Sequence, residues 1–135
     1  MKLEKKILKI LSEAKEASRA LANVPTKDKN KALLAMADAL LKNSRYILLR
    51  NAKDVSLAKK AGRSKALIDR LTLTDTRIKG MADSLKALAT LKDPCGEVLK
   101  QWKRHNGLLI KKVRVPIGVI GIIYESRPNV TSDCA

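Results

Sequence analysis

The sequence predicts an α/β protein that begins with a series of helices and continues into strands. Three observations lead to this fold class. Apolar residues recur at helical spacing through residues 1–92, the period shortens to strand-like alternation over 97–115, and an apolar run rich in β-branched residues follows at 119–124. We therefore expect three parts, namely a helical part over 1–92, a hairpin over 93–115, and a strand with its following loop over 116–135.

Four amphipathic helices are expected in the first part. Their ranges are about 1–23, 27–42, 45–60 and 75–91. Thr26, Ser44 and Thr74 precede three of them and can cap their first turns. A further short helical turn is expected at 66–68. Apolar stripes of this kind usually form a core, so we assign them no function.

The alternating segment predicts a β-hairpin with its turn at His105-Asn106-Gly107. Charged residues continue along much of both strands. Because an isolated two-stranded ribbon is only marginally stable in water, we expect residues 97–115 to pack against something else, which can be a neighbouring subunit.

The run from Val119 to Tyr124 predicts a strand that is buried on both faces, as in parallel sheets. It ends in the polar loop 125–129, after which Thr131 and Asp133 can begin a helix. Ligands of open α/β sheets bind beyond the carboxyl ends of the strands, so this loop is the predicted site. No second parallel strand follows, so the chain reads as the front of something longer.

The composition is that of a globular chain with a strongly basic surface. Of the 135 residues, 45% are hydrophobic and 31% are charged, and the formal net charge is +16. Such a charge favours an anionic partner, and a small basic module that binds nucleic acid through its phosphates is one alternative. We favour a solvated basic surface, because the lysines are spread over helix exteriors and only 2% of the residues are aromatic side chains that could stack on bases.

Cysteine usage and hydropathy point to a reducing compartment. Cys95, Cys134 and the single histidine, His105, form neither a disulfide framework nor a zinc site at any usual spacing. No apolar run approaches the length of a membrane span, and the N-terminus interleaves Lys and Glu with Ile and Leu, unlike a secretory signal. We expect a cytoplasmic protein with no metal and no membrane partner.

Several segments resemble one known family. The stretch 115–131, Val-Pro-Ile-Gly-Val-Ile-Gly-Ile-Ile-Tyr-Glu-Ser-Arg-Pro-Asn-Val-Thr, resembles the signature of the γ-glutamyl phosphate reductases (glutamate-5-semialdehyde dehydrogenases) of the aldehyde dehydrogenase superfamily. Residues 67–73 and 91–98, and Trp102 with 106–108, resemble further segments of that family. Cys95 departs from the pattern, because a small aliphatic residue is expected there.

The resemblance implies an aldehyde dehydrogenase-like fold, represented here by its N-terminal part. Residues 1–92 would be helices of the cofactor-binding domain, 93–115 would resemble the oligomerisation arm, and 116–135 would hold the first strand and loop of the nucleotide-binding sheet. The implied reaction is NADPH-dependent reduction of L-glutamyl 5-phosphate to L-glutamate 5-semialdehyde with release of phosphate, in L-proline biosynthesis. A homo-oligomer through the hairpin is implied as well.

The resemblance also implies roles for residues of the loop. Asn129 best matches the asparagine that donates to the developing oxyanion in related enzymes, and a helix cap or turn residue is the alternative. Arg127 can pair with a phosphate of substrate or cofactor, or be an ordinary loop cation. Tyr124, Glu125 and Ser126 would lie beside the cofactor by position.

The family's nucleophilic cysteine lies downstream of the matched stretch, and Cys134 is not that residue. We therefore expect no nucleophile in this chain and no dehydrogenase activity from it alone. A further possibility is an oligomerising remnant that pairs with full-length subunits through 97–115.

Overall fold

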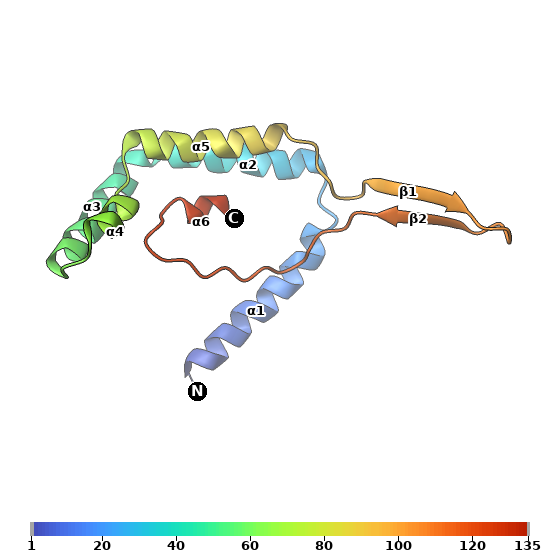
Figure 1. Cartoon of the computed structure of the whole chain (residues 1–135), viewed down its shortest axis with the longest axis horizontal. Coiled ribbons are helices and arrows are strands. Elements are labelled where there is room, and N and C mark those ends of the chain that lie inside the picture. Colours follow the sequence, from blue (N-terminus) through green and yellow to red (C-terminus); the bar gives the residue numbers. More distant parts are fainter. Residues whose placement is uncertain (1, 135) are drawn as a thin grey trace. The chain divides into compact units, whose positions relative to one another are not determined.

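The computed structural model describes residues 2–134. Figure 1 shows its helices and strands, which in chain order are α1 (Lys2–Leu21), α2 (Thr26–Lys42), α3 (Ser44–Lys60), α4 (Lys65–Leu71), α5 (Asp75–Thr90), β1 (Val98–Lys103), β2 (Leu109–Val113) and α6 (Val130–Asp133). The chain divides into two compact units. One lies within Met1–Thr26 and Lys92–Gly121, and the other within Lys27–Leu91 and Ile122–Ala135.

The core of the second unit lies between α2 and α5, which run side by side in Figure 1. Ala37 and Ala82 are fully buried and Leu85 is nearly so, with half-buried apolar side chains of α2 packed against them. The two alanines have small side chains, so they let the helices approach closely. The helical spacing of the sequence predicted amphipathic helices over 27–42 and 75–91 whose apolar stripes form a core, and the structure confirms this.

Of the three predicted capping residues, one caps the first turn of its helix. The Thr74 hydroxyl accepts a hydrogen bond from the backbone N–H of Arg77 at 3.2 Å, as a capping residue does. Thr26 and Ser44 are instead the first residues of α2 and α3. The Thr26 hydroxyl donates to the carboxylate of Asp93 at 2.9 Å, so it is used in a tertiary contact that local sequence does not reveal.

The helical turn expected at 66–68 is a full short helix, α4. Ser64 caps it, with its hydroxyl accepting from the backbone N–H of Leu67 at 3.3 Å. The helix ends at Leu71, and the link to α5 passes through Thr72 and Leu73.

The predicted hairpin is confirmed. Strands β1 and β2 are antiparallel, with Trp102 opposite Ile110 and an irregularity between Val98 and Lys100. At the turn, Gly107 has φ of +87°, a conformation that favours glycine, and the side chain of Asn106 accepts from the backbone N–H of Leu108 at 3.2 Å.

The apolar stripe of α1 does not form a core among the described residues. Leu3, Ile7 and Leu21 are 70%, 48% and 61% exposed. The helix forms where the periodicity predicts it, but no apolar surface of its own unit covers this face. Amphipathicity predicts that a helix has a face to bury, and it does not supply the partner.

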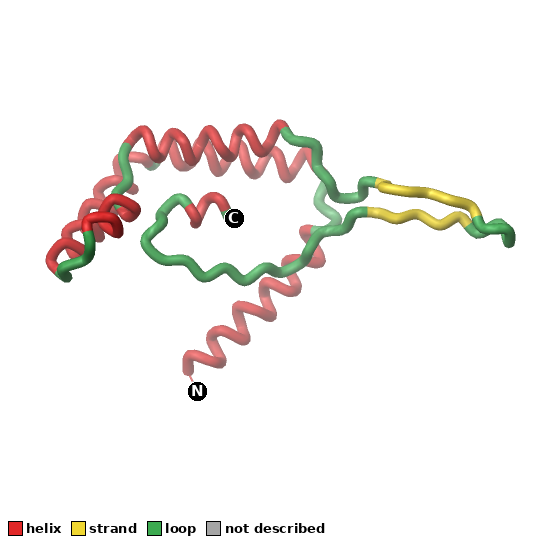
Figure 2. The backbone as a smooth tube through the Cα atoms, in the orientation of Figure 1, coloured by secondary structure: helices red, strands yellow, loops and turns green. Residues whose placement is uncertain are grey.

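The prediction of a buried strand at 119–124 is wrong for this structure. Val119–Tyr124 lies in neither helix nor strand, and Figure 2 shows the segment as a loop between β2 and α6. Ile123 is fully exposed. A parallel strand needs a neighbour for its backbone N–H and C=O groups, and the one sheet formed by residues 2–134 contains only β1 and β2.

Candidate functional site

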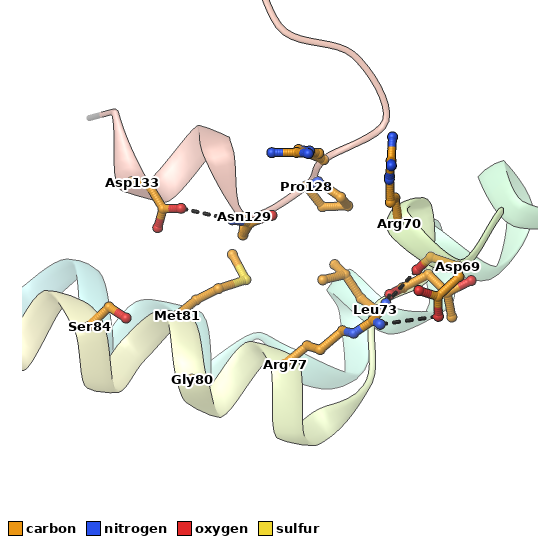
Figure 3. Close-up of a pocket in the computed structure, with 12 residues that line it drawn as sticks. Asp69, Arg70, Leu73, Arg77, Gly80, Met81, Ser84, Pro128, Asn129 and Asp133 are labelled. Atoms are coloured by element: carbon orange, nitrogen blue, oxygen red, sulfur yellow. Dashed lines mark hydrogen bonds and ion pairs between the residues drawn. The ribbon is translucent and has the colours of Figure 1, made fainter. Parts of the chain in front are cut away.

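A cavity of about 500 Å³ lies in the second unit. The link between α4 and α5, the first turns of α5, and the loop that leads into α6 form its walls. Figure 3 shows Met81 rising from α5 toward Asn129 across this space. The cavity therefore brings the predicted loop 125–129 against a segment that is about fifty residues earlier in the sequence.

Arg77 holds the α4–α5 link in place. Its guanidinium donates to the backbone carbonyls of Asp69 and Thr72 and pairs with the Asp69 carboxylate at 3.2 Å. The Thr72 hydroxyl donates to the carbonyl of Ile68 at 2.7 Å. The charge of Arg77 is thus used in the wall of the cavity, where its guanidinium joins the last turn of α4 to the link that follows.

Asn51 fastens the same link from the side of α3. Its side chain is buried, with 7% of the residue exposed. The amide donates to the carbonyl of Leu71 at 2.8 Å and accepts from the N–H of Leu73 at 2.7 Å. One side chain therefore satisfies a backbone acceptor and a backbone donor, as a paired strand would.

Asn129 lies at the N-cap position of α6, but its side chain makes no capping bond. Instead, its side-chain amide donates to the Asp133 carboxylate at 2.8 Å, and the Ser132 hydroxyl donates to the backbone carbonyl of Asn129, also at 2.8 Å. An amide NH₂ carries a second hydrogen. Asn129 also lines the cavity, and the side-chain hydrogen bond found for its amide among the described residues uses one hydrogen only.

Arg127 lines this cavity and also a second one of about 330 Å³. Tyr124 and Ser126 line the second cavity, and Leu73 and Pro128 are shared by both. The Tyr124 hydroxyl is hydrogen-bonded to that of Thr131 at 2.7 Å. The structure therefore gathers four of the five predicted site residues around two adjoining cavities.

Glu125 is the exception, since it lines neither cavity. Ser126 has φ of +57°, in the left-handed region that non-glycine residues rarely adopt. Sharp backbone turns of this kind are concentrated at functional sites. Here the turn at Ser126 separates Tyr124, on the side of the second cavity, from Asn129, on the side of the first.

Sequence reasoning missed Arg70, Arg77 and Asn51, which also belong to the two cavities or their walls. Arg70 falls within 67–73, a segment that carried the family resemblance, so a signal was present. Asn51 sits in the middle of a helix, where asparagine is disfavoured. That local conflict is the signal by which it could have been found.

Metal ligands and cysteines of the described residues do not add to this site. Among residues 2–134, no group of three or more His, Cys, Asp or Glu side chains is arranged to hold a metal ion. Both cysteines are free, and neither lines either cavity. No helix of the described residues is both long and apolar enough to cross a membrane.

Comparison with known proteins gives a consistent result. No protein-family model matches the chain. The gamma-glutamyl phosphate reductase of Geobacter metallireducens is 49% identical over 135 residues, which are 100% of this chain and 32% of the relative. The enzyme of the same name from Caldanaerobacter subterraneus subsp. tengcongensis is 56% identical over 123 residues, which are 91% of this chain and 30% of the relative.

Solved structures of two reductases are similar to this one. The gamma-glutamyl phosphate reductase of Thermotoga maritima matches with a TM-score of 0.91 and 46% identity, over 94% of this chain and 31% of that chain. The enzyme from Saccharomyces cerevisiae matches with a TM-score of 0.89 and 31% identity, over 93% of this chain and 32% of that chain.

The fold of this chain is therefore a partial aldehyde dehydrogenase-like fold. The chain is homologous to the gamma-glutamyl phosphate reductases over its whole length. It spans between 30% and 32% of the length of the curated relatives named above.

Proposed function

We propose that this chain forms part of an NADPH-dependent gamma-glutamyl phosphate reductase, which converts L-glutamyl 5-phosphate to L-glutamate 5-semialdehyde and phosphate in L-proline biosynthesis. The observation that carries the proposal is that Asn129 and Arg127, the two residues to which the reaction assigns hydrogen-bonding and phosphate-binding roles, line one cavity. Homology to enzymes of this name supports the substrate class.

In the proposed reaction Asn129 acts on the carbonyl of the acyl phosphate. A thiolate attacks the carbonyl carbon, and negative charge grows on the former carbonyl oxygen. The second amide hydrogen of Asn129 donates to that oxygen, while its bond to Asp133 keeps the amide oriented. The thiolate is proposed to come from a cysteine outside these 135 residues, because neither Cys95 nor Cys134 lines the cavity.

Arg127 is proposed to bind the phosphoryl group. When the carbonyl re-forms, the bond between the acyl carbon and the phosphate oxygen breaks, and that oxygen keeps the electron pair. A guanidinium matches the geometry of phosphate and offsets the charge that collects on the leaving group. The side chain of Arg127 is exposed and has no ion-pair or hydrogen-bond partner among the described residues, so it is available for this role.

We propose that the second cavity holds one ring of a nicotinamide cofactor. Ile47, Leu71 and Leu73 supply apolar walls, and Tyr124 and Ser126 lie at its edge. A volume of about 330 Å³ is at the small end of ligand sites, so these residues would hold a ring and not a whole dinucleotide. When bound, NADPH supplies the hydride that reduces the acyl group. Glu125 is not assigned to this site, because it lines neither cavity.

We also propose that residues 97–115 contact another subunit of the same enzyme. Both strands carry exposed large apolar side chains, among them Val98, Leu99 and Leu109 at 47%, 48% and 50%. Deletion of the hairpin is then expected to abolish co-purification with full-length subunits. The reaction is placed in the cytoplasm, where free cysteines such as Cys95 and Cys134 stay reduced.

A chimera tests the proposed function. This chain replaces the matching stretch of the Geobacter metallireducens reductase, with which it aligns over 135 residues, and NADPH oxidation is measured with glutamyl phosphate generated in situ. We expect the chimera to be active, and Asn129→Ala to lower its kcat by roughly a hundredfold, as loss of one oxyanion donor does.

Asn23→Ala is the matched control, since Asn23 is exposed and its amide bonds only to the Arg19 carbonyl. A folded chimera without NADPH oxidation, beside an active parent enzyme, would overturn the proposal. Equal kcat values for the Asn129 and Asn23 variants would remove Asn129 from the mechanism.

A further inference from the structure

Two arginines of the larger cavity have no charge partner. Arg70 and Arg127 both line it, and neither side chain makes an ion pair or hydrogen bond with a described residue. In Figure 3 the side chain of Arg70 extends from α4 next to Pro128. Arg70 lies in the last turn of α4 and Arg127 lies shortly before α6, so segments far apart in the sequence supply the two cations.

The cavity also contains one ion pair and one carboxylate that is hydrogen-bonded to a neutral amide. Its lining contains three arginines and two aspartates. Arg77 is paired with Asp69 at 3.2 Å, and Asp133 accepts from Asn129 at 2.8 Å. The neutral amide of Asn129 leaves the charge of Asp133 uncancelled, so three arginines and two aspartates give the cavity a net charge of +1, with neither Arg70 nor Arg127 in an ion pair. Such a set of donors suits a dianion that can accept several hydrogen bonds.

The backbone beneath both arginines is held in place. Arg70 lies between Asp69, whose carbonyl accepts from Arg77, and Leu71, whose carbonyl accepts from Asn51. Arg127 lies between Ser126, with φ of +57°, and Pro128, whose ring restricts its own backbone. The positions of the two side chains are thus set by the fold, while their guanidinium groups remain free to close on a ligand.

We propose that Arg70 is a second anion-binding residue of this site, and that Arg70 and Arg127 together bind one phosphate-type dianion. The identity of the ligand rests on the proposed function, where the dianion is the phosphoryl group of the acyl phosphate or a phosphate of the cofactor. The proposal that the two arginines bind the same anion rests only on their shared position in the cavity. A bound phosphate would then select acyl phosphates over uncharged acyl donors.

Phosphate binding to the 135-residue chain is the first test. The arginine side-chain Nε–Hε signals are followed by NMR while inorganic phosphate is added at constant ionic strength. We expect Arg70→Gln and Arg127→Gln each to weaken phosphate binding about tenfold, corresponding to loss of one charge-assisted hydrogen-bonding partner. Arg63→Gln is the control for the lost charge, because Arg63 is exposed and lines neither cavity.

Arg70→Lys separates anion binding from support of the helix. A lysine keeps the positive charge at the end of α4, where it complements the helix dipole, but it lacks the planar fork that binds phosphate through two hydrogen bonds. We expect Arg70→Lys to retain the stability of the native chain and to bind phosphate more weakly. Equal phosphate affinity in the Arg70→Gln and Arg63→Gln variants would overturn the proposal.

Kinetics of the chimera distinguish the two sources of phosphate. A raised KM for glutamyl phosphate in Arg70→Gln, with an unchanged KM for NADPH, supports binding of the substrate phosphoryl group. A raised KM for NADPH alone supports binding of a cofactor phosphate. Unchanged values of both would overturn a role for Arg70 in the enzyme. An active chimera with this last result would leave the proposed function standing, so the two proposals fail separately.

Discussion

At the scale of single residues, Asn51 shows how one buried polar side chain can fix the wall of a cavity. Its amide joins the carbonyl of Leu71 to the N–H of Leu73, and these two backbone groups flank the turn from α4 to α5. The turn carries Arg70 on one side and leads to Arg77 on the other. A side chain from α3 thus determines where the cationic wall of the cavity lies.

We expect Asn51→Ala to destabilise the fold by about 2 kcal/mol, because it leaves a partly buried carbonyl and N–H without partners. Asn51→Asp keeps the acceptor for Leu73 but sets a carboxylate against the Leu71 carbonyl, so it is expected to be destabilising as well. Urea denaturation followed by circular dichroism measures both. Wild-type stability of Asn51→Ala would show that water replaces the two bonds without cost.

At the scale of elements, the hairpin is held at its base by a small charge cluster. The Glu97 carboxylate accepts a hydrogen bond from Lys92 at 3.0 Å and pairs with Arg114 at 3.3 Å. The backbones of Glu97 and Arg114 are paired as well, since the N–H of Arg114 donates to the carbonyl of Glu97 at 2.9 Å. The hydrogen bond and positive charge of Lys92, with a smaller contribution from Arg114, lower the pKa of Glu97 from its ordinary value of 4.5.

The lowered pKa predicts acid sensitivity of the hairpin. A carboxyl group with a depressed pKa in the folded state stabilises that state at pH values above its unfolded pKa. The contribution is lost as the pH falls from about 4.5 through the lower, folded pKa. Fluorescence of Trp102, the single tryptophan, is expected to report loosening of the hairpin in this range.

Glu97→Gln provides the control for this acid transition, because it cannot titrate. Its fluorescence profile is expected to lack the component that the native chain shows below pH 4.5. Added salt is expected to weaken the component in the native chain, since the cluster is accessible to solvent. Superimposable profiles for the two proteins would assign the transition to another group.

At the scale of the whole molecule, the residues proposed to bind substrate have no cysteine beside them in the described part of the chain. Cys95 is half-buried, Cys134 is exposed, and neither lines the cavity that contains Asn129. We therefore expect the 135-residue chain alone to show no oxidation of NADPH in the presence of glutamyl phosphate. A spectrophotometric assay, with the chimera as positive control, measures this.

Turnover by the chain alone would contradict that expectation, and a Cys134→Ser variant would then show whether Cys134 is the nucleophile. Binding and chemistry are separable in this test. A chain that binds phosphate but does not oxidise NADPH is the expected result, because the proposed anion site consists of arginines within these residues.

By itself, the sequence determined the helices, the cap at Thr74 and the hairpin turn at Gly107, because these depend on side chains a few residues apart. It also predicted the loop 125–129 as a site, from its position after the apolar run, and the resemblance to a family supplied the roles expected of its residues. Only the tertiary structure decided that Arg70 and Arg127 share a cavity and that Asn51 holds its wall. It also decided that the apolar run 119–124 stays outside any sheet. These outcomes depend on partners that are distant in the sequence. A local sequence pattern shows what a segment can bury or bind, but it does not show which partner the segment contacts.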